Sequence, residues 1–246
     1  MSRNLSSDID VYIDHFKNTV KRLREYEFNQ KDRVLKKNIL VSVIDALSRS
    51  TSNGQGNNRK RFTGIIEQFA NWPNHTRVSA PHISYFLGNL HEQKYETAKE
   101  FIAQTMRNNS DGRLVTLASD PELNEIERLW PVQPEQKLVG QLSLTSFTHL
   151  NLLYQYRNSL VHELREPGYG MEFNKIDDEP FYHTMSSIDS ENSTGQQSLE
   201  LVYPLNFYFR ITDSVIINLE KYFRKNEIDP YSYYKFGSSW IGELNT

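Results

Sequence analysis

The sequence predicts a mainly α-helical protein: a four-helix bundle with a helical insertion and a small peripheral β-hairpin. Apolar residues recur at spacings of three and four along four long stretches, which is the pattern of helices with one buried face. Two short stretches, 181–186 and 199–203, instead alternate apolar and polar residues, as half-buried strands do. We therefore expect one domain over residues 1–246. The four bundle helices are predicted at about 8–28, 33–49, 143–166 and 205–225.

The first two helices are expected to form a hairpin joined by a short polar turn. Ser6, Ser7 and Asp8 are candidates for the cap of the first helix, and Asp32 for the cap of the second. The apolar face of the first helix consists of Tyr12, Phe16, Val20 and Leu23. That of the second consists of Leu35, Ile39, Val43, Ala46 and Leu47.

Residues 50–140 are expected to be a helical insertion between the second and third bundle helices. It begins with a Gly-, Asn- and Ser-rich stretch that ends in three successive cations, Arg59, Lys60 and Arg61. Such a cluster can hold a phosphate backbone, or it can simply be the solvated start of a helix. Ser79 and Asp120 are candidate caps within the insertion. Its helices are predicted at 62–72, 82–90, 95–107 and 121–130.

A charged residue interrupts the apolar face of the third bundle helix. At about 100° per residue, Arg157 falls in the middle of a stripe of aliphatic side chains. A guanidinium group in that position must be paired, or must face a cavity or an interface, because it cannot lose its proton. The stripe consists of Leu150, Leu153, Leu160, Val161 and Leu164.

The string RNSLVH, from Arg157 to His162, places a polar residue after an arginine and a histidine after four intervening positions. It resembles the signature of the HEPN superfamily, small helical bundles many of which are metal-independent ribonucleases. The resemblance implies that Arg157 and His162 are catalytic, that Asn158 supports the site, and that a homodimer brings two such pairs into one cleft. Alternatively, Arg157 pairs with a carboxylate from another helix and His162 is a solvated helix residue.

The function hypothesis is cleavage of RNA by attack of the ribose 2′-hydroxyl on the adjacent phosphorus, without a cofactor. His162 would move the proton and Arg157 would stabilise charge on the phosphate oxygens. Arg59, Lys60 and Arg61 would bind RNA. Besides RNA and a second copy, a cognate antitoxin or regulatory protein is a candidate partner, in the setting of a toxin or defence effector. The alternative is a HEPN module that binds a nucleotide, RNA or protein and performs no chemistry.

Composition and missing motifs exclude several other classes. The net charge of −3 means that RNA binding needs a local basic patch, and the absence of cysteine removes disulfides and thiolate chemistry. The spacings of His75, His82 and His91 match no metal-ligand pattern, so no metal site is expected. No nucleotide-binding glycine motif, signal peptide or apolar membrane span is present, so we expect a cytoplasmic protein without a membrane partner.

The chain after the third bundle helix starts with helix breakers, Pro167, Gly168 and Gly170. The linker between the two predicted strands, 187–198, is rich in Ser, Asn and Gly and is a candidate for disorder. The last bundle helix follows Pro204. The aromatic tail from Asp229 onward lacks a helical period and is expected to pack on the bundle or on a partner.

Overall fold

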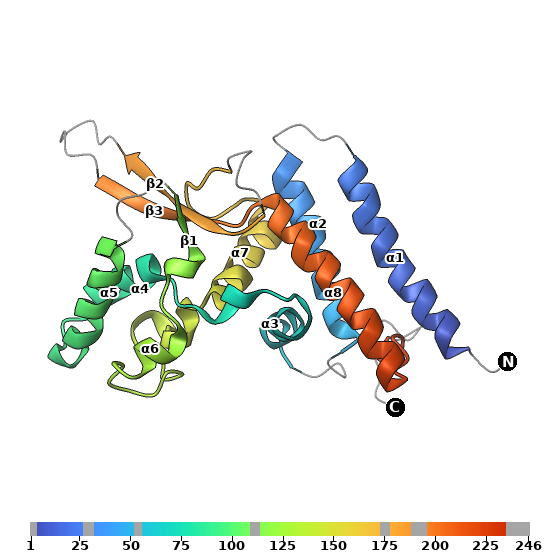
Figure 1. Cartoon of the computed structure of the whole chain (residues 1–246), viewed down its shortest axis with the longest axis horizontal. Helices are drawn as coiled ribbons and strands as arrows, with labels where there is room; N and C mark the ends of the chain where they lie inside the picture. The colour runs from blue at the N-terminus through green and yellow to red at the C-terminus, as the bar shows by residue number, and fades with distance from the viewer. Residues whose placement is uncertain are drawn as a thin grey trace, which may run out of the picture.

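Five long helices form the main body of the protein, seen on the right and in the centre of Figure 1. The computed structural model describes residues 4–26, 32–51, 56–108, 114–172, 178–187 and 196–234. It confirms the mainly α-helical class. The five helices are α1 (Leu5–Glu25), α2 (Arg33–Arg49), α3 (Asn58–Phe69), α7 (His149–Glu163) and α8 (Leu205–Asn226).

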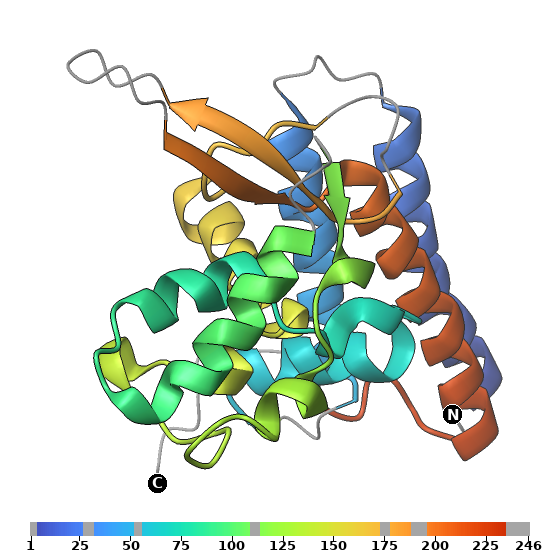
Figure 2. The ribbon, with the colours of Figure 1, turned by 60° about the vertical axis from the view of Figure 1, so that its left-hand side comes forward.

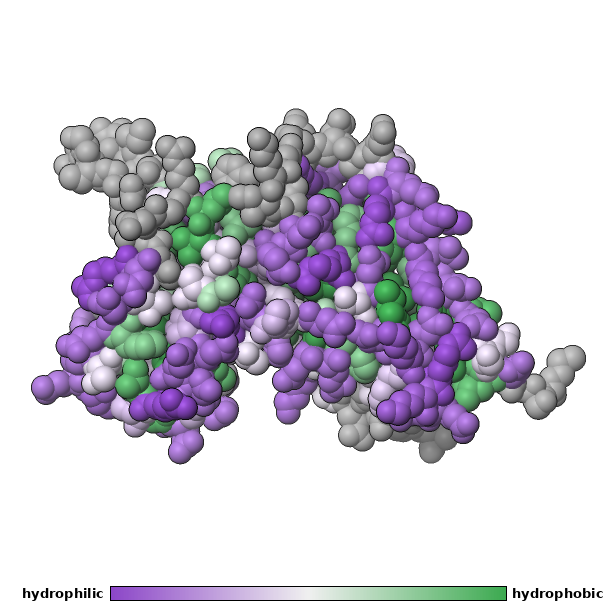
Figure 3. Space-filling view, in the orientation of Figure 1, coloured by the Kyte–Doolittle hydropathy of each residue, from purple (hydrophilic) through white to green (hydrophobic). Residues whose placement is uncertain are grey.

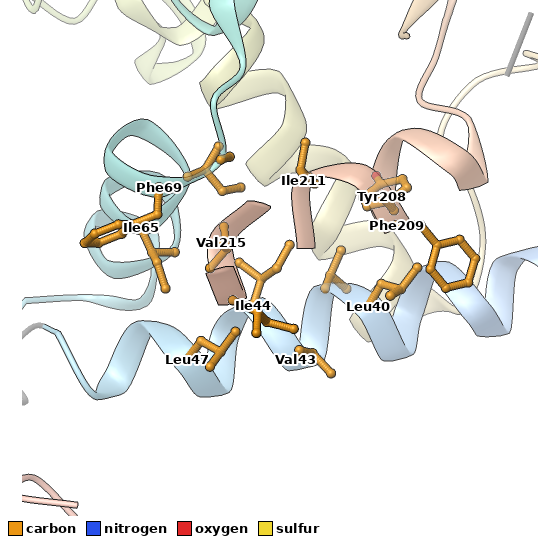
Figure 4. Packing of buried hydrophobic residues seen from close by; sticks show 14 of the residues in the cluster. Leu40, Val43, Ile44, Leu47, Ile65, Phe69, Tyr208, Phe209, Ile211 and Val215 are labelled. Carbon is orange, nitrogen blue, oxygen red and sulfur yellow. The ribbon is translucent and has the colours of Figure 1, made fainter. Parts of the chain in front are cut away.

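The last helix, α8, packs against both α1 and α2 (Figure 1). Two ion pairs link its outer face to α1: Lys17 to Glu220 at 2.7 Å and Arg24 to Asp213 at 2.6 Å. Its inner face contributes large buried side chains to the main core. Figure 4 shows this packing, with Leu40, Val43, Ile44 and Leu47 of α2 beside Tyr208, Phe209, Ile211 and Val215 of α8, and Ile65 and Phe69 of α3.

The start of α1 corrects the prediction from the sequence. The helix begins at Leu5 and its cap is Asn4, whose side chain accepts the backbone N–H of Ser6 at 3.1 Å. Ser6, Ser7 and Asp8 therefore lie inside the first turn, where an acidic residue such as Asp8 is favoured by the helix dipole. The predicted end of this helix, at about residue 28, lies outside the described residues.

The bundle contains a fifth helix that the sequence pattern had assigned to the insertion. Helix α3 begins at Asn58, four residues before the predicted start, because the side chain of Asn57 accepts the N–H of Lys60 at 2.9 Å. It packs against α2, α7 and α8. Its buried face consists of Phe62, Ile65, Ile66 and Phe69.

A second, smaller hydrophobic cluster lies beside the bundle, at the left of Figure 1. It joins α4 (Ala80–Gly88), α5 (Glu96–Asn108) and α6 (Leu123–Glu127), and includes the fully buried ring of Tyr95. Val78, just before α4, forms a β-bridge with Thr148, just before α7. This bridge connects the smaller cluster to the start of α7. The cap of α6 is Glu122 and not Asp120 as predicted.

A three-stranded antiparallel sheet covers the junction between the two clusters. The predicted hairpin is present as β2 (Phe181–Ser187) and β3 (Gln196–Val202), and it extends away from the body in Figure 2. The sequence pattern missed β1 (Leu114–Thr116), which adds to the free edge of β2. Three residues are too short for an alternating pattern to be recognised. Residues 188–195, most of the predicted disordered linker, lie outside the described part of the chain.

The outer surface is largely polar. Figure 3 shows mostly hydrophilic residues along α1 and α5, with hydrophobic residues exposed mainly between the elements. In the ranges that the structure describes, none of the helices is both long and apolar enough to cross a membrane. Beyond α8, Tyr231 and Tyr234 of the aromatic tail stack edge-on against Tyr12.

Candidate functional site

The helix that carries the motif is shorter than predicted. Helix α7 runs from His149 to Glu163, and the residues before it, Leu144–Phe147, form a 3-10 turn. It ends at Leu164, which adopts a left-handed conformation and is 66 % exposed. Leu153 and Leu160 are fully buried, so the centre of the predicted stripe is confirmed and its C-terminal member is not.

Arg157 is buried and paired. Its Nε donates to Oδ2 of Asp45 at 2.8 Å, and its Nη2 donates to the same oxygen. Its Nη1 donates to the side-chain oxygen of Asn158 at 3.1 Å. Asp45 belongs to α2, so Arg157 is paired with a carboxylate from another helix, which was one of the two arrangements expected for a charge in this stripe.

The Arg157–Asp45 pair lies at a small cavity of about 80 Å³ between α2, α3 and α7. Arg49 and Arg61 also line it, so three arginines surround one aspartate. Burial raises the pKa of the Asp45 carboxyl, whereas the charges of Arg157, Arg49 and Arg61 oppose that rise. The cavity therefore carries an excess of permanent positive charge, which suits an oxyanion such as phosphate.

A fourth arginine, Arg59 of α3, contacts α7 without being among the residues that line this cavity. Arg59 donates to Oδ1 of Asn151 from Nε at 3.1 Å and from Nη2 at 2.8 Å. Its guanidinium carbon is 6.0 Å from the centre of the Tyr154 ring, and that of Arg157 is 5.8 Å from the same ring. The tyrosine thus lies within cation–π range of both arginines.

The three members of the predicted cationic cluster differ in how far they are buried. Arg59 and Arg61 are partly buried, whereas Lys60 is exposed. Arg61 lines the same cavity as Arg157, and Arg59 approaches the Tyr154 ring that Arg157 also approaches. Arg61 is held by the carbonyl of Gly56 at 2.9 Å and by the side-chain oxygen of Asn58. Fold geometry therefore joins two separate sequence features, the 59–61 cluster and the motif arginine.

His162 lies apart from this group. It is exposed on α7, about 7.5 Å along the axis and about 140° around it from Arg157. Among the described residues that line the cavity, none is a histidine. The structure thus brings Arg157, Asn158, Arg59 and Arg61 together and leaves His162 facing solvent on the same helix.

Two residues of the site were missed by reasoning from the sequence, Asp45 and Arg49. Asp45 is the single acidic residue of α2 and lies directly after the buried Ile44. A lone carboxylate beside the apolar face of a helix is a signal of an ion pair with another helix, and the lone arginine in the stripe of α7 is its counterpart. Because Asp45 and Arg157 are 112 positions apart, the sequence pattern does not show that they pair.

No metal centre is formed by the residues that the structure describes, since no three His, Cys, Asp or Glu side chains gather there. His75 and His82 each use Nδ1 in a local hydrogen bond, to the carbonyl of Trp72 and to Oγ of Ser79, both at 2.6 Å. His91 is exposed. No model of a protein family, no curated protein and no solved structure matches this chain.

Proposed function

We propose that the protein is a metal-independent endoribonuclease of the HEPN type, which cleaves RNA by attack of the ribose 2′-hydroxyl on the neighbouring phosphorus. The observation that carries this proposal is that Arg157 of α7 and Arg61 of α3 line one cavity, with Arg59 of α3 near the Tyr154 ring that Arg157 also approaches. The same α7 that carries Arg157 also carries the exposed His162. A phosphate site and a proton-transfer group are the two parts that this reaction needs.

In this proposal the arginines hold the phosphate. A guanidinium group stays charged and offers donors in a planar fork, which suits two phosphate oxygens. Asp45 fixes the orientation of Arg157 and leaves the Nη1 side of its fork toward Asn158. The site is therefore preorganised, so that little side-chain freedom is lost when RNA binds.

His162 takes the role of general base or general acid. An imidazole can both accept and donate a proton through its two ring nitrogens, and that of His162 is exposed. Its separation from Arg157 within one chain favours an active homodimer, in which two copies of α7 combine their groups in one cleft. Three exposed apolar residues follow His162 and supply a surface for such contact: Leu164, Tyr169 and Met171.

The test is incubation of the purified protein with RNA in excess EDTA, followed by analysis of the product ends. We expect products with 2′,3′-cyclic phosphates, and loss of cleavage in His162→Ala. His91→Ala is the matched control, because His91 is also an exposed histidine on the surface. Arg157→Lys keeps a cation beside the partly buried Asp45 carboxylate but loses the planar fork of donors. It should therefore reduce cleavage without leaving Asp45 unpaired. Full activity in His162→Ala would overturn the proposal.

A second candidate function is an RNA- or nucleotide-binding module without catalysis. It is favoured by the position of His162, which does not line the basic cavity, and by the hydrogen bonds that already engage three of the five Arg157 N–H groups with Asp45 and Asn158. This function predicts that RNA binds, that Arg61→Gln and Arg157→Lys weaken binding, and that no cleavage occurs in any variant. Product analysis and filter binding on the same samples separate the two functions.

The biological setting of a toxin or defence effector is part of the proposal. A ribonuclease of this kind is harmful to the cell that makes it unless a cognate partner restrains it. Expression of the intact chain should therefore slow growth, and His162→Ala should restore it. Equal toxicity of the two proteins would argue against this setting, whatever the outcome of the cleavage assay.

A further inference from the structure

A second cavity lies on the opposite side of α7 from Arg157. It has a volume of about 280 Å³ and lies between α4, α7, β3 and the segment after α7. Gln155 and Gly168 at its edge are exposed, so it opens to solvent. Its volume is just below the usual range for drug-sized ligands, which suits a smaller molecule.

One wall of this cavity is His82, whose ring is anchored by a buried chain of hydrogen bonds. The Tyr182 hydroxyl lies 2.7 Å from Oδ2 of Asp120 and 2.7 Å from Oγ of Ser79, and Ser79 lies 2.6 Å from Nδ1 of His82. His149 Nε2 also contacts Oδ2 of Asp120 at 2.7 Å. The chain therefore runs from a buried carboxylate to the imidazole of His82.

The number of available protons decides which group donates in each of these hydrogen bonds. A carboxylate only accepts, so the single proton of Tyr182 goes to Asp120. Ser79 then donates to Tyr182, and Nδ1–H of His82 donates to Ser79. Burial lowers the pKa of His82 to about 4, so the ring is neutral near pH 7. Nε2 of His82 is consequently left as a hydrogen-bond acceptor.

The opposite wall supplies a second acceptor, the carboxylate of Glu200 on β3. Its Oε1 accepts the Ser198 hydroxyl at 2.9 Å and its Oε2 accepts the N–H of Tyr169 at 3.2 Å. These two bonds hold the carboxylate in place. A carboxylate has about four lone-pair positions, so each oxygen retains the capacity to bind a ligand.

The rest of the lining combines apolar and polar groups. Leu152, Tyr156, Leu201 and Tyr203 supply apolar and aromatic surface, and Gln155 and Ser159 of α7 supply polar side chains. Apolar and aromatic walls with a few fixed polar groups are typical of sites for planar heterocycles. Because both Glu200 and His82 accept hydrogen bonds, the matching ligand presents hydrogen-bond donors, and a planar ligand presents them as N–H groups at its edge.

We propose that this cavity binds a guanine base, with Glu200 accepting its N1–H and 2-amino groups and Nε2 of His82 acting as a second acceptor. Guanine presents two adjacent N–H donors that match the two oxygens of a carboxylate. Adenine and cytosine present a single amino group beside a ring acceptor, which a carboxylate repels. Recognition of a base through its pairing edge requires that the base be unpaired, as it is in single-stranded RNA.

The position of the cavity links it to the proposed cleavage site. Ser159, which lines the cavity, and His162 lie about 60° apart on α7 and about 4.5 Å along its axis. A guanine in the cavity would therefore place its ribose and phosphate near His162. Because Arg157 lies on the opposite side of the same helix, the arginines that hold this phosphate would come from the second copy in the proposed homodimer, and cleavage would occur next to guanine. This specificity rests on the proposed ribonuclease function, whereas the binding of guanine does not.

The test of binding uses nucleosides, which lack the phosphate that the arginines would hold. Calorimetric titration of the intact protein should show guanosine binding at least about tenfold tighter than inosine, adenosine or cytidine. Inosine lacks only the 2-amino group. Glu200→Gln should reduce guanosine affinity by about tenfold or more, because an amide presents a donor to one of the two N–H groups. Glu67→Gln, at an exposed glutamate on α3, is the matched control.

A second variant displaces the carboxylate without removing it. The Cβ of an alanine at position 168 would lie 2.6 Å from Oε2 of Glu200, and Gly168 has a left-handed φ of +74°, so Gly168→Ala must change the relative position of this backbone segment and the carboxylate. It should weaken guanosine binding in a protein whose thermal unfolding shows that it is folded. Equal binding of all four nucleosides, no binding of guanosine, or tighter binding of a primary amine such as putrescine would each overturn the proposal.

Cleavage assays distinguish the failure of this proposal from the failure of the ribonuclease function. If both are correct, His162→Ala binds guanosine normally and does not cleave, while Glu200→Gln cleaves with reduced preference for guanine. Guanosine binding without any RNA cleavage would retain the cavity assignment and remove the ribonuclease. RNA cleavage that shows no preference for guanine and is unchanged in Glu200→Gln would retain the ribonuclease and remove the cavity assignment.

Discussion

The carboxylate of Asp45 on α2 holds the guanidinium of Arg157 on α7, and the two residues are 112 positions apart in the chain. The side chains are only 24 % and 10 % exposed, so both charges have lost most of their hydration. The pair orients the arginine that the proposed phosphate site needs. It also connects two helices of the bundle.

Removal of either partner should destabilise the fold. Arg157→Ala leaves the carboxylate of Asp45 partly buried without its partner, and we expect a loss of about 2 to 3 kcal/mol in the free energy of unfolding. Urea unfolding of the intact protein and of Arg157→Ala measures this loss. The double variant with Asp45→Ala should be less unstable than the sum of the two single variants, because no unpaired charge remains. Strict additivity would show that the pair contributes nothing.

Lys37 should contribute more to the stability of the fold than the exposed lysines do. It is fully buried in α2, with its Nζ 2.7 Å from Glu166 and also in contact with Glu172. Lys37→Met leaves two largely buried carboxylates without a cation, and should cost about 3 to 5 kcal/mol in urea unfolding. Lys17→Met is the control: its ion pair with Glu220 is exposed and should contribute less than about 1 kcal/mol. Similar effects of the two variants would contradict this assignment.

The stability of the protein should fall between about pH 6.5 and pH 4. Burial, together with the charge of His149, lowers the pKa of His82 to about 4, while Asp120 and Glu200 oppose the shift. The unfolded chain, with an ordinary histidine pKa near 6.5, therefore binds the proton first as the pH falls, which costs about 3 kcal/mol of stability by pH 4. Below pH 4 this group causes no further loss.

Urea unfolding of the intact protein and of His82→Gln across that pH range isolates the contribution of His82. The variant is expected to lack that part of the pH dependence, although other groups that titrate in the range still contribute to both curves. Parallel curves for the two proteins would show that His82 does not titrate in this way.

Two glycines should respond oppositely to alanine. At Gly170 a Cβ would lie 2.6 Å from Cγ2 of Val202 and 3.3 Å from the carbonyl oxygen of Leu201, so β3 would have to move. We expect Gly170→Ala to lower the melting temperature by several degrees, which corresponds to about 1 to 3 kcal/mol. At Gly64, inside α3, a Cβ meets no atom within 4 Å. Gly64→Ala should stabilise by up to about 1 kcal/mol. A stabilising change at position 170 would contradict the observed packing.

Local periodicity determined most of the helices. The spacing of apolar residues located α2 and α8 to within about a residue, and the alternation of polarity located β2 and β3. Helix ends were less accurate, because caps depend on single side-chain hydrogen bonds such as that of Asn57 to the backbone of Lys60. The role of α3 in the bundle depends on which faces it meets, and an amphipathic pattern does not specify its partner.

The sequence by itself determined that Arg157 interrupts an apolar face and must therefore be paired or face a cavity, since a buried guanidinium cannot be neutralised. It also identified the cations at 59–61 as a separate feature. The packing of the elements shows what the pattern did not: Asp45 is the partner of Arg157, Arg61 lines the same cavity, and His82 and Glu200 line another. Periodicity reports which face of an element is buried, whereas contacts between residues distant in the chain arise only when those faces pack together.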